Sequence, residues 1–161
     1  MMAVCWKQVS GVVSVMVSNF RSEPASRGAG ILAALTEAAR QRILILDGAM
    51  GTQIQGLGLS EEDFDGHGSC ACHGHAQKGN NDLLILTQPQ AIEDIHYAYA
   101  RAGADIVETN TFGATSVAQD DYHMAHLVYE MNVAAAKLAR AACDKYSTPD
   151  KPRFVAGAFG P

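Results

Sequence analysis

The chain has 161 residues, of which 48% are hydrophobic and 18% are charged, a balance typical of a globular protein. Its net charge of −5 and the lack of a basic cluster in the sequence argue against a nucleic acid partner, which requires a positively charged surface. Its four cysteines are unevenly spaced and do not suggest a disulfide framework, so a reducing compartment such as the cytoplasm is expected.

Residues 1–34 are predicted to form a leader or extension, for the most part without stable structure. Within them, residues 8–20 are apolar and rich in serine, with basic residues on both sides. This stretch is too short to span a bilayer, and we expect no membrane partner. A mitochondrial presequence is the alternative to an irregular leader, because no acidic residue precedes Glu23.

Three short apolar segments are predicted to be strands: residues 43–46, 104–107 and 153–156. Apolar runs of this length are typical of strands that are buried on both faces. Residues 83–86 have a similar composition. We predict that they form an extended lead-in to the next helix, because no crossover would separate them from neighbouring strands.

Two helices are predicted, at residues 90–102 and 122–146, because apolar residues recur there at spacings of three and four. Pro89 suits the first turn of the first helix, and Gly103 suits its left-handed cap. Strands that alternate with helices predict βαβ units and a parallel sheet. The predicted fold class is therefore α/β, the N-terminal part of a (β/α)8 TIM-type barrel, with residues 35–161 as a partial domain.

A complete barrel of this type takes about 250 residues. The predicted domain is shorter, so we expect it to be truncated relative to its architecture. An incomplete barrel exposes a sheet edge, and we expect this span alone to be marginally folded.

The candidate binding residues follow the first two predicted strands. They are Asp47, Gly48, Ala49, Met50, Gly51 and Thr52 after the first, and Glu108, Asn110 and Thr111 after the second. The carboxyl ends of parallel strands are where α/β folds place their ligands. Glycines allow a sharp turn that brings main-chain N–H groups close to a ligand, so an amino acid could place its carboxylate there and its ammonium group on Asp47. The alternatives are a plain strand-ending turn, and ion pairs between the acids and neighbouring basic residues.

Four blocks of sequence resemble, in order, the homocysteine-binding domain of cobalamin-dependent methionine synthase. They are residues 42–52, with Asp47-Gly48-Ala49-Met50-Gly51-Thr52; residues 78–84, with Asn80-Asn81-Asp82; residues 102–112, with Glu108-Thr109-Asn110-Thr111-Phe112; and Val155-Ala156-Gly157 with Gly160-Pro161. The resemblance covers residues 35–161.

The resemblance implies a homocysteine S-methyltransferase, which transfers a methyl group to the homocysteine thiolate and forms methionine. It also implies zinc and methylcobalamin as cofactors, together with cobalamin and folate modules as partners in the full-length protein. Asp47 and the main chain that follows it, with Glu108, Asn110 and Thr111, would bind homocysteine. A betaine- or S-methylmethionine-dependent homocysteine methyltransferase is the alternative, and so is a truncated fragment without catalytic activity.

The resembling family binds zinc through three cysteines. None of Cys5, Cys70, Cys72 and Cys143 occupies a matching position, so no metal ligand is assigned and this span alone is predicted to be inactive. Metal coordination would otherwise supply the thiolate.

A separate cluster of Cys70, Cys72, His73 and His75, with His67 before it, is a weaker candidate for a metal site. The ligands crowd into one glycine-rich stretch instead of forming two separated pairs, so a loop without a specific metal is favoured. Elsewhere, His96, His123 and His126 are expected at helix surfaces or the core edge, and Cys143 is expected to be partly buried.

Overall fold

The computed structural model describes residues 25–66 and 74–160. The chain divides into two compact units, Met1–Ile45 and Leu46–Pro161. The described part of the first unit is mainly α1 (Ala25–Gln41), so the predicted boundary after residue 34 falls inside a helix. No helix among the described residues has the length and apolar character needed to cross a membrane.

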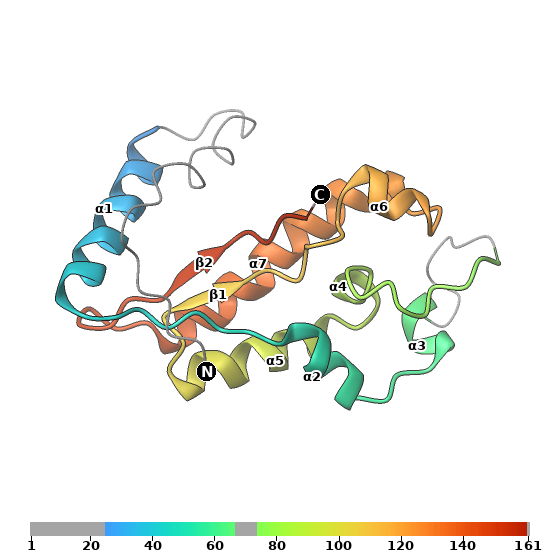
Figure 1. Cartoon of the computed structure of the whole chain (residues 1–161), viewed down its shortest axis with the longest axis horizontal. Coiled ribbons are helices and arrows are strands. Elements are labelled where there is room, and N and C mark those ends of the chain that lie inside the picture. Colours follow the sequence, from blue (N-terminus) through green and yellow to red (C-terminus); the bar gives the residue numbers. More distant parts are fainter. Residues whose placement is uncertain (1–24, 67–73, 161) are drawn as a thin grey trace. The chain divides into compact units, whose positions relative to one another are not determined.

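The second unit has an α/β architecture (Figure 1). Its elements in chain order are α2 (Met50–Gly56), α3 (Glu61–Asp65), α4 (Leu84–Thr87), α5 (Pro89–Ala102), β1 (Ile106–Glu108), α6 (Ser116–Asp120), the 3-10 helix η1 (Ala125–Leu127), α7 (Val128–Tyr146) and β2 (Phe154–Ala156). The predicted combination of parallel strands and covering helices is thus confirmed at the level of the α/β class.

β1 and β2 pair in parallel, with Val107 opposite Val155. Leu46 forms an isolated parallel bridge to Ile106, so the order across the sheet is Leu46, β1, β2. The prediction of a fully buried strand at residues 43–46 is wrong, because only Leu46 has strand-like pairing and its side chain is 36% exposed. Leu46 has one strand neighbour among the described residues, and an apolar run is buried only where its neighbours cover it.

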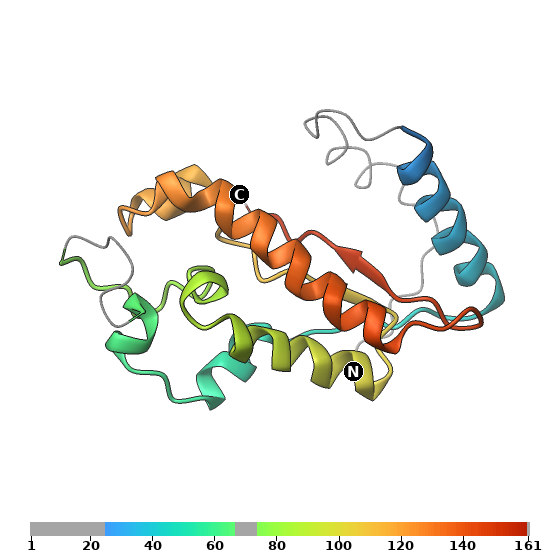
Figure 2. The same cartoon turned by 180° about the vertical axis from the view of Figure 1, so that it is seen from behind.

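Two helices pack together against this sheet, and Figure 2 shows α7 running along it. α5 begins at Pro89 and ends at Ala102, and it is capped by Gly103, whose φ of 112° is left-handed, as predicted. α7 begins at Val128 and not at residue 122. The main chain turns left-handed at His123, where φ is 58°, and this conformation is incompatible with a continuous α-helix.

Residues 84–86 lie in α4, and Leu83 precedes it with helical backbone angles, so the prediction of an extended lead-in segment is wrong. The N–H groups of Leu86 and Thr87 both donate to the carbonyl of Leu83, and Leu84 accepts from Gln88. Leu83 and Leu84 are fully buried and pack into different apolar clusters, one with Met124 and the other with Ile92. A helical turn directs adjacent side chains to different sides, so tertiary packing selects the helix here.

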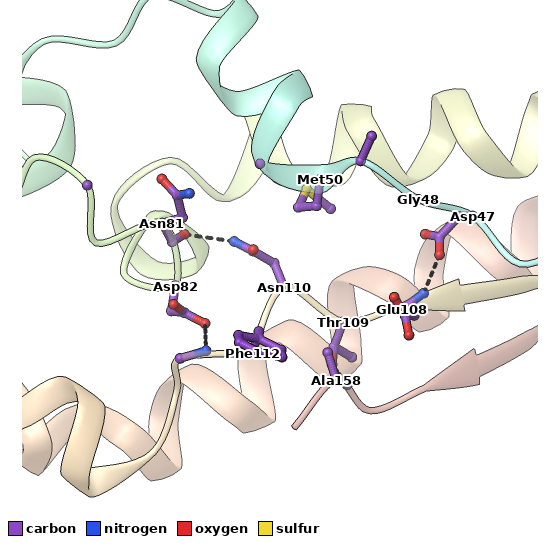
Figure 3. Close-up of a pocket in the computed structure, with 14 residues that line it drawn as sticks. Asp47, Gly48, Met50, Asn81, Asp82, Glu108, Thr109, Asn110, Phe112 and Ala158 are labelled. Atoms are coloured by element: carbon purple, nitrogen blue, oxygen red, sulfur yellow. Dashed lines mark hydrogen bonds between the residues drawn. The ribbon is translucent and has the colours of Figure 1, made fainter. Parts of the chain in front are cut away.

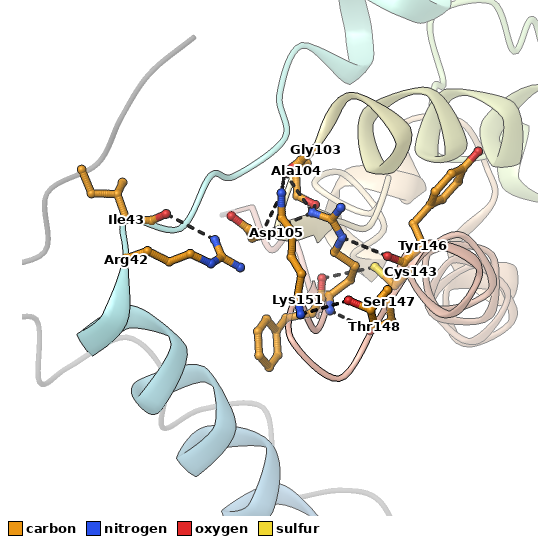
Figure 4. Close-up of polar contacts among 12 residues, drawn as sticks. Arg42, Ile43, Gly103, Ala104, Asp105, Cys143, Tyr146, Ser147, Thr148 and Lys151 are labelled. Carbon is orange, nitrogen blue, oxygen red and sulfur yellow. Dashed lines mark hydrogen bonds and ion pairs between the residues drawn. The ribbon is translucent and has the colours of Figure 1, made fainter.

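A buried polar contact connects the amino ends of β1 and β2 (Figure 4). Arg153 Nη1 donates to the carbonyl oxygens of Gly103 (2.9 Å) and Ala104 (2.6 Å) and to Asp105 Oδ1 (3.3 Å). Lys151 Nζ lies 3.9 Å from the same carboxylate oxygen. The contact fixes the relative position of the two strands at the end opposite their carboxyl termini.

Candidate functional site

A pocket of about 330 Å³ lies at the carboxyl ends of the strands (Figure 3). It is lined by Asp47, Gly48, Ala49, Met50, Gly51, Gly79, Asn81, Asp82, Glu108, Thr109, Asn110, Phe112, Gly113 and Ala158. The volume is at the lower end of the range for small-molecule sites. The structure therefore brings most of the predicted binding residues to one cavity.

Two predicted residues lie outside the pocket lining. Thr52 is exposed on α2, and Thr111 is buried with its hydroxyl donated to the Ala158 carbonyl (2.7 Å). Thr111 Oγ1 also lies 2.6 Å from Thr109 Oγ1. Thr111 thus holds the segment after β2 against the segment after β1, where it supports the pocket wall.

Asp47 and Glu108 meet at the rim. The main-chain N–H of Glu108 donates to Asp47 Oδ1 at 3.0 Å (Figure 3). Burial raises the pKa of Asp47 to about 7; the Glu108 N–H opposes this shift, and the Glu108 carboxylate adds to it. Asp47 is therefore close to half ionised at neutral pH, and a cation that bound there would favour its charged form.

The turn between Leu46 and α2 is left-handed at Ala49, where φ is 49° and ψ is 34°. Gly48 and Gly51 have no positive φ, so the sharp turn does not depend on the glycines as predicted. The turn itself, from Gly48 to Gly51, lines the pocket.

Asn81 and Asp82 form another wall of the pocket, in addition to the turn that follows Asp47. The sequence-based assignment of the site omitted both residues. Asn110 Nδ2 donates to the Asn81 carbonyl at 2.7 Å, and the Gly113 N–H donates to Asp82 Oδ1 at 3.0 Å (Figure 3). Burial raises the pKa of Asp82, and the Gly113 N–H opposes the shift. The available signal was the Asn80-Asn81-Asp82 run, which the second resembling block contains.

The pocket is acidic. Asp47, Asp82 and Glu108 line it, and among the described residues no lysine or arginine does. The predicted alternative of an ion pair with a basic neighbour does not describe Asp47, whose hydrogen bond comes from the Glu108 main chain. Such a lining suits a ligand that carries a positive group, because a buried carboxylate is stabilised by an opposite charge.

Residues 44–161 match the family model of the homocysteine S-methyltransferases. The chain belongs to this family. Two solved structures resemble it, both of the homocysteine methyltransferase MmuM from Escherichia coli. The metallated form has 26% sequence identity and a TM-score of 0.59, with 81% of this chain and 41% of that one covered. The oxidized form has 25% identity and a TM-score of 0.57, with 74% and 37% covered. The chain therefore spans less than half the length of these relatives.

One of the two MmuM structures is a metallated form. For the present chain, the sequence resemblance implies zinc. Among residues 25–66 and 74–160, no three His, Cys, Asp or Glu side chains are grouped so that they could hold a metal ion. Cys143 is fully buried and its thiol donates to the Phe154 carbonyl, so it does not line the pocket. The described residues of this family member do not fit the implied zinc site.

The other candidate metal cluster lies mainly outside the described residues, which include neither Cys70, Cys72 nor His73. His75 is described and exposed, and its ring lies 3.9 Å from that of His123. His96 departs from the expected helix-surface position, because it is fully buried and neither ring nitrogen has a hydrogen-bond partner. Burial lowers the pKa of His96 to about 4, so it is neutral at physiological pH.

Proposed function

We propose that the pocket binds homocysteine as part of a homocysteine S-methyltransferase. The observation that carries the proposal is the meeting of Asp47 and Glu108 at the carboxyl ends of parallel strands, in a chain that belongs to this family. The reaction would break the bond between a donor and its methyl group, form a new bond to the homocysteine sulfur and release the thiol proton.

The amino-acid end of homocysteine accounts for the polar lining. Its ammonium group would bind between the carboxylates of Asp47 and Glu108, and would stabilise the ionised form of Asp47. Its carboxylate would accept hydrogen bonds from main-chain N–H groups of the turn from Gly48 to Gly51, which lines the pocket. The role of these residues is to hold and orient the substrate, which lowers the entropic cost of methyl transfer.

The same proposal places β1 and β2 in a (β/α)8 barrel. The order Leu46, β1, β2 with parallel pairing is that of three consecutive barrel strands, and helices α5 and α7 cover one face of them. The likeness to MmuM supports this assignment. The outer edge of β2 would then pair with a further strand of the full-length protein.

For the methyl donor, we favour methylcobalamin and a methionine-synthase-like enzyme, which carries cobalamin and folate modules. The support is the amino-acid sequence of residues 78–84 and 108–111, which resembles the corresponding sequence of methionine synthase. S-methylmethionine is the second candidate, because it is a cation and the pocket is acidic. Homocysteine is the only ligand that we assign to the described residues.

Calorimetric titration of the 161-residue chain with L-homocysteine tests the proposal. We expect saturable binding that Asp47→Asn weakens at least tenfold, because the neutral amide no longer pairs with the ammonium group. Asp144→Asn is the matched control, since Asp144 lies on the surface of α7 in an ion pair with Arg140. Equal affinities of the wild type and Asp47→Asn would contradict the assignment.

A further inference from the structure

Three buried amide side chains lie behind the pocket and do not line it: Gln77, Asn80 and Gln119. Asn80 and Gln119 form two reciprocal hydrogen bonds, each of 2.9 Å, from the amide nitrogen of one to the amide oxygen of the other. Asn80 Nδ2 also donates to Gln77 Oε1 at 3.2 Å. These contacts join the loop before α4 to α6, across 39 positions of sequence.

Gln119 makes a further contact that reaches the pocket. Its Nε2 donates to the Gly113 carbonyl at 3.0 Å, while the Gly113 N–H donates to Asp82 Oδ1 at 3.0 Å. These contacts form a closed circuit, by which we mean a ring of linked residues. Hydrogen bonds join Gln119 to Asn80, Asp82 to Gly113 and Gly113 to Gln119, and the main chain joins Asn80 to Asp82. The two pocket walls, at Asp82 and Gly113, are both members of this circuit.

We propose that Gln119 is a positioning residue that sets the separation between these two walls of the pocket. The proposal concerns the geometry of the wall, and its consequence for ligand affinity rests on the proposed homocysteine site. Gln119 touches neither the pocket nor the reacting atoms; it acts through Gly113 and Asn80.

The amide network is fully satisfied, which makes it rigid. Both amide hydrogens of Gln119 and both of Asn80 are donated within it. Gln77 Nε2 donates to the carbonyls of His75 (3.3 Å) and Tyr122 (3.1 Å). A buried network in which every polar group has a partner specifies one arrangement, because any other leaves a polar group without a hydrogen bond.

The Asp82 carboxylate also packs directly against the main chain of Gly113. A Cβ on Gly113 would lie 2.7 Å from Asp82 Oδ2, so a larger residue at this position would displace the carboxylate. A shift of Gly113 is therefore transmitted to the Asp82 carboxylate through this contact and through the Gly113 N–H bond.

The experiment compares the wild-type chain with Gln119→Leu, and uses Gln90→Leu as the matched control. The Gln90 residue is exposed, and its amide donates to Glu93 and Asp94 on the surface of α5. The pKa of Asp82 is followed by NMR of its side-chain carboxyl carbon, and exchange of the Gly113 amide hydrogen is followed in the same samples.

In Gln119→Leu, we expect the pKa of Asp82 to rise and the Gly113 amide to exchange faster, because the Gly113 N–H bond that opposes the pKa shift is weakened. Homocysteine affinity should also fall, because Asp82 and Gly113 line the pocket that is proposed to hold it. Gln90→Leu should change none of these quantities. An unchanged Asp82 pKa and Gly113 exchange rate in a folded Gln119→Leu chain would overturn the proposal.

Two further measurements separate the possible outcomes. If the Gln119 variant does not fold, exchange of the Gln119 side-chain amide in the wild type decides: slower exchange than at Gln90 supports the proposal, and equal exchange overturns it. If the wild type does not bind homocysteine, the proposed function fails, whereas the pKa of Asp82 still tests the positioning role.

Discussion

Asp47 Oδ1 accepts a 3.0 Å hydrogen bond from the main-chain N–H of Glu108, 61 positions away in the sequence. The bond joins the turn before α2 to the end of β1, and it places two acidic side chains at one rim of the pocket. Their proximity has measurable consequences for stability as well as for ligand binding.

Asp47→Asn should stabilise the protein at about pH 8 while it weakens ligand binding. The pKa of Asp47 is raised from 3.8 to about 7, so the folded state binds more protons than the unfolded state between these values. This contribution to stability is therefore present near pH 4 and is lost as the pH rises to about 7. Asparagine keeps the acceptor for Glu108 and carries no charge.

Guanidinium unfolding at several pH values measures this effect. The difference in stability between Asp47→Asn and the wild type should grow as the pH rises from about 4 to about 7 and then level off. Asp144→Asn, on the exposed surface of α7, serves as the control variant in the same measurements. A constant difference across this range would refute the explanation.

His96→Leu should stabilise the protein in mild acid. The pKa of His96 is lowered from 6.5 to about 4, so the unfolded state binds more protons in this interval, and stability falls as the pH drops below 6.5. At pH 4 the difference amounts to about 3 kcal/mol, at about 1.4 kcal/mol for each pKa unit. Leucine fills a similar volume and leaves no polar atom without a partner.

The matched control for this prediction is His126→Leu, because His126 is exposed. Chemical unfolding at about pH 5 and about pH 8 should show a gain from His96→Leu that is larger at the lower pH. A gain of the same size at both pH values would mean that protonation of His96 does not contribute.

Arg153→Met should lower the free energy of unfolding by about 3 kcal/mol or more, because it removes a buried cation that lies 3.3 Å from the buried Asp105 carboxylate. It also removes the donors to the Gly103 and Ala104 carbonyls. Arg101→Met, on the exposed side of α5, should change stability by less than about 0.5 kcal/mol. Urea denaturation gives both values, and equal losses in the two variants would disprove the role of Arg153.

The 161-residue chain should bind homocysteine without forming methionine from either methylcobalamin or S-methylmethionine. The reason is that the resembling family binds zinc through three cysteines, and none of the four cysteines of this sequence occupies a matching position. Product analysis by mass spectrometry, with and without added zinc, tests this. Methionine formation that disappears in Asp47→Asn would show that the chain is catalytic by itself.

The sequence predicted the regular elements with the strongest local signals. Pro89 and Gly103 mark the limits of α5, and the strands at Ile106 and Phe154 are short apolar runs. Predictions from the spacing of apolar residues were wrong where tertiary contacts determine the local structure. The segment that includes Leu83 and Leu84 turns into a helix because these two side chains pack into different apolar clusters. The apolar pattern of α7 continues toward residue 122, but the left-handed main chain at His123 prevents the helix from starting there, and the spacing of apolar residues does not reveal such a turn.

Part of the pocket was predictable for a similar reason. Parallel strands bring their carboxyl ends to one edge, so the meeting of Asp47 and Glu108 follows from topology. Asn81 and Asp82 follow no strand, and their position depends on long-range hydrogen bonds to Asn110 and Gly113. Contacts of that kind leave no periodic trace in the sequence.

The burial of Cys143 limits the reactivity of its thiol. A cysteine reacts with electrophiles as the thiolate, and only where the reagent can reach it. The Cys143 sulfur is enclosed by the core and donates its hydrogen to the Phe154 carbonyl, and burial raises the pKa of its thiol. Within the described part of the chain, this sulfur is therefore expected to resist alkylation by reagents in solution.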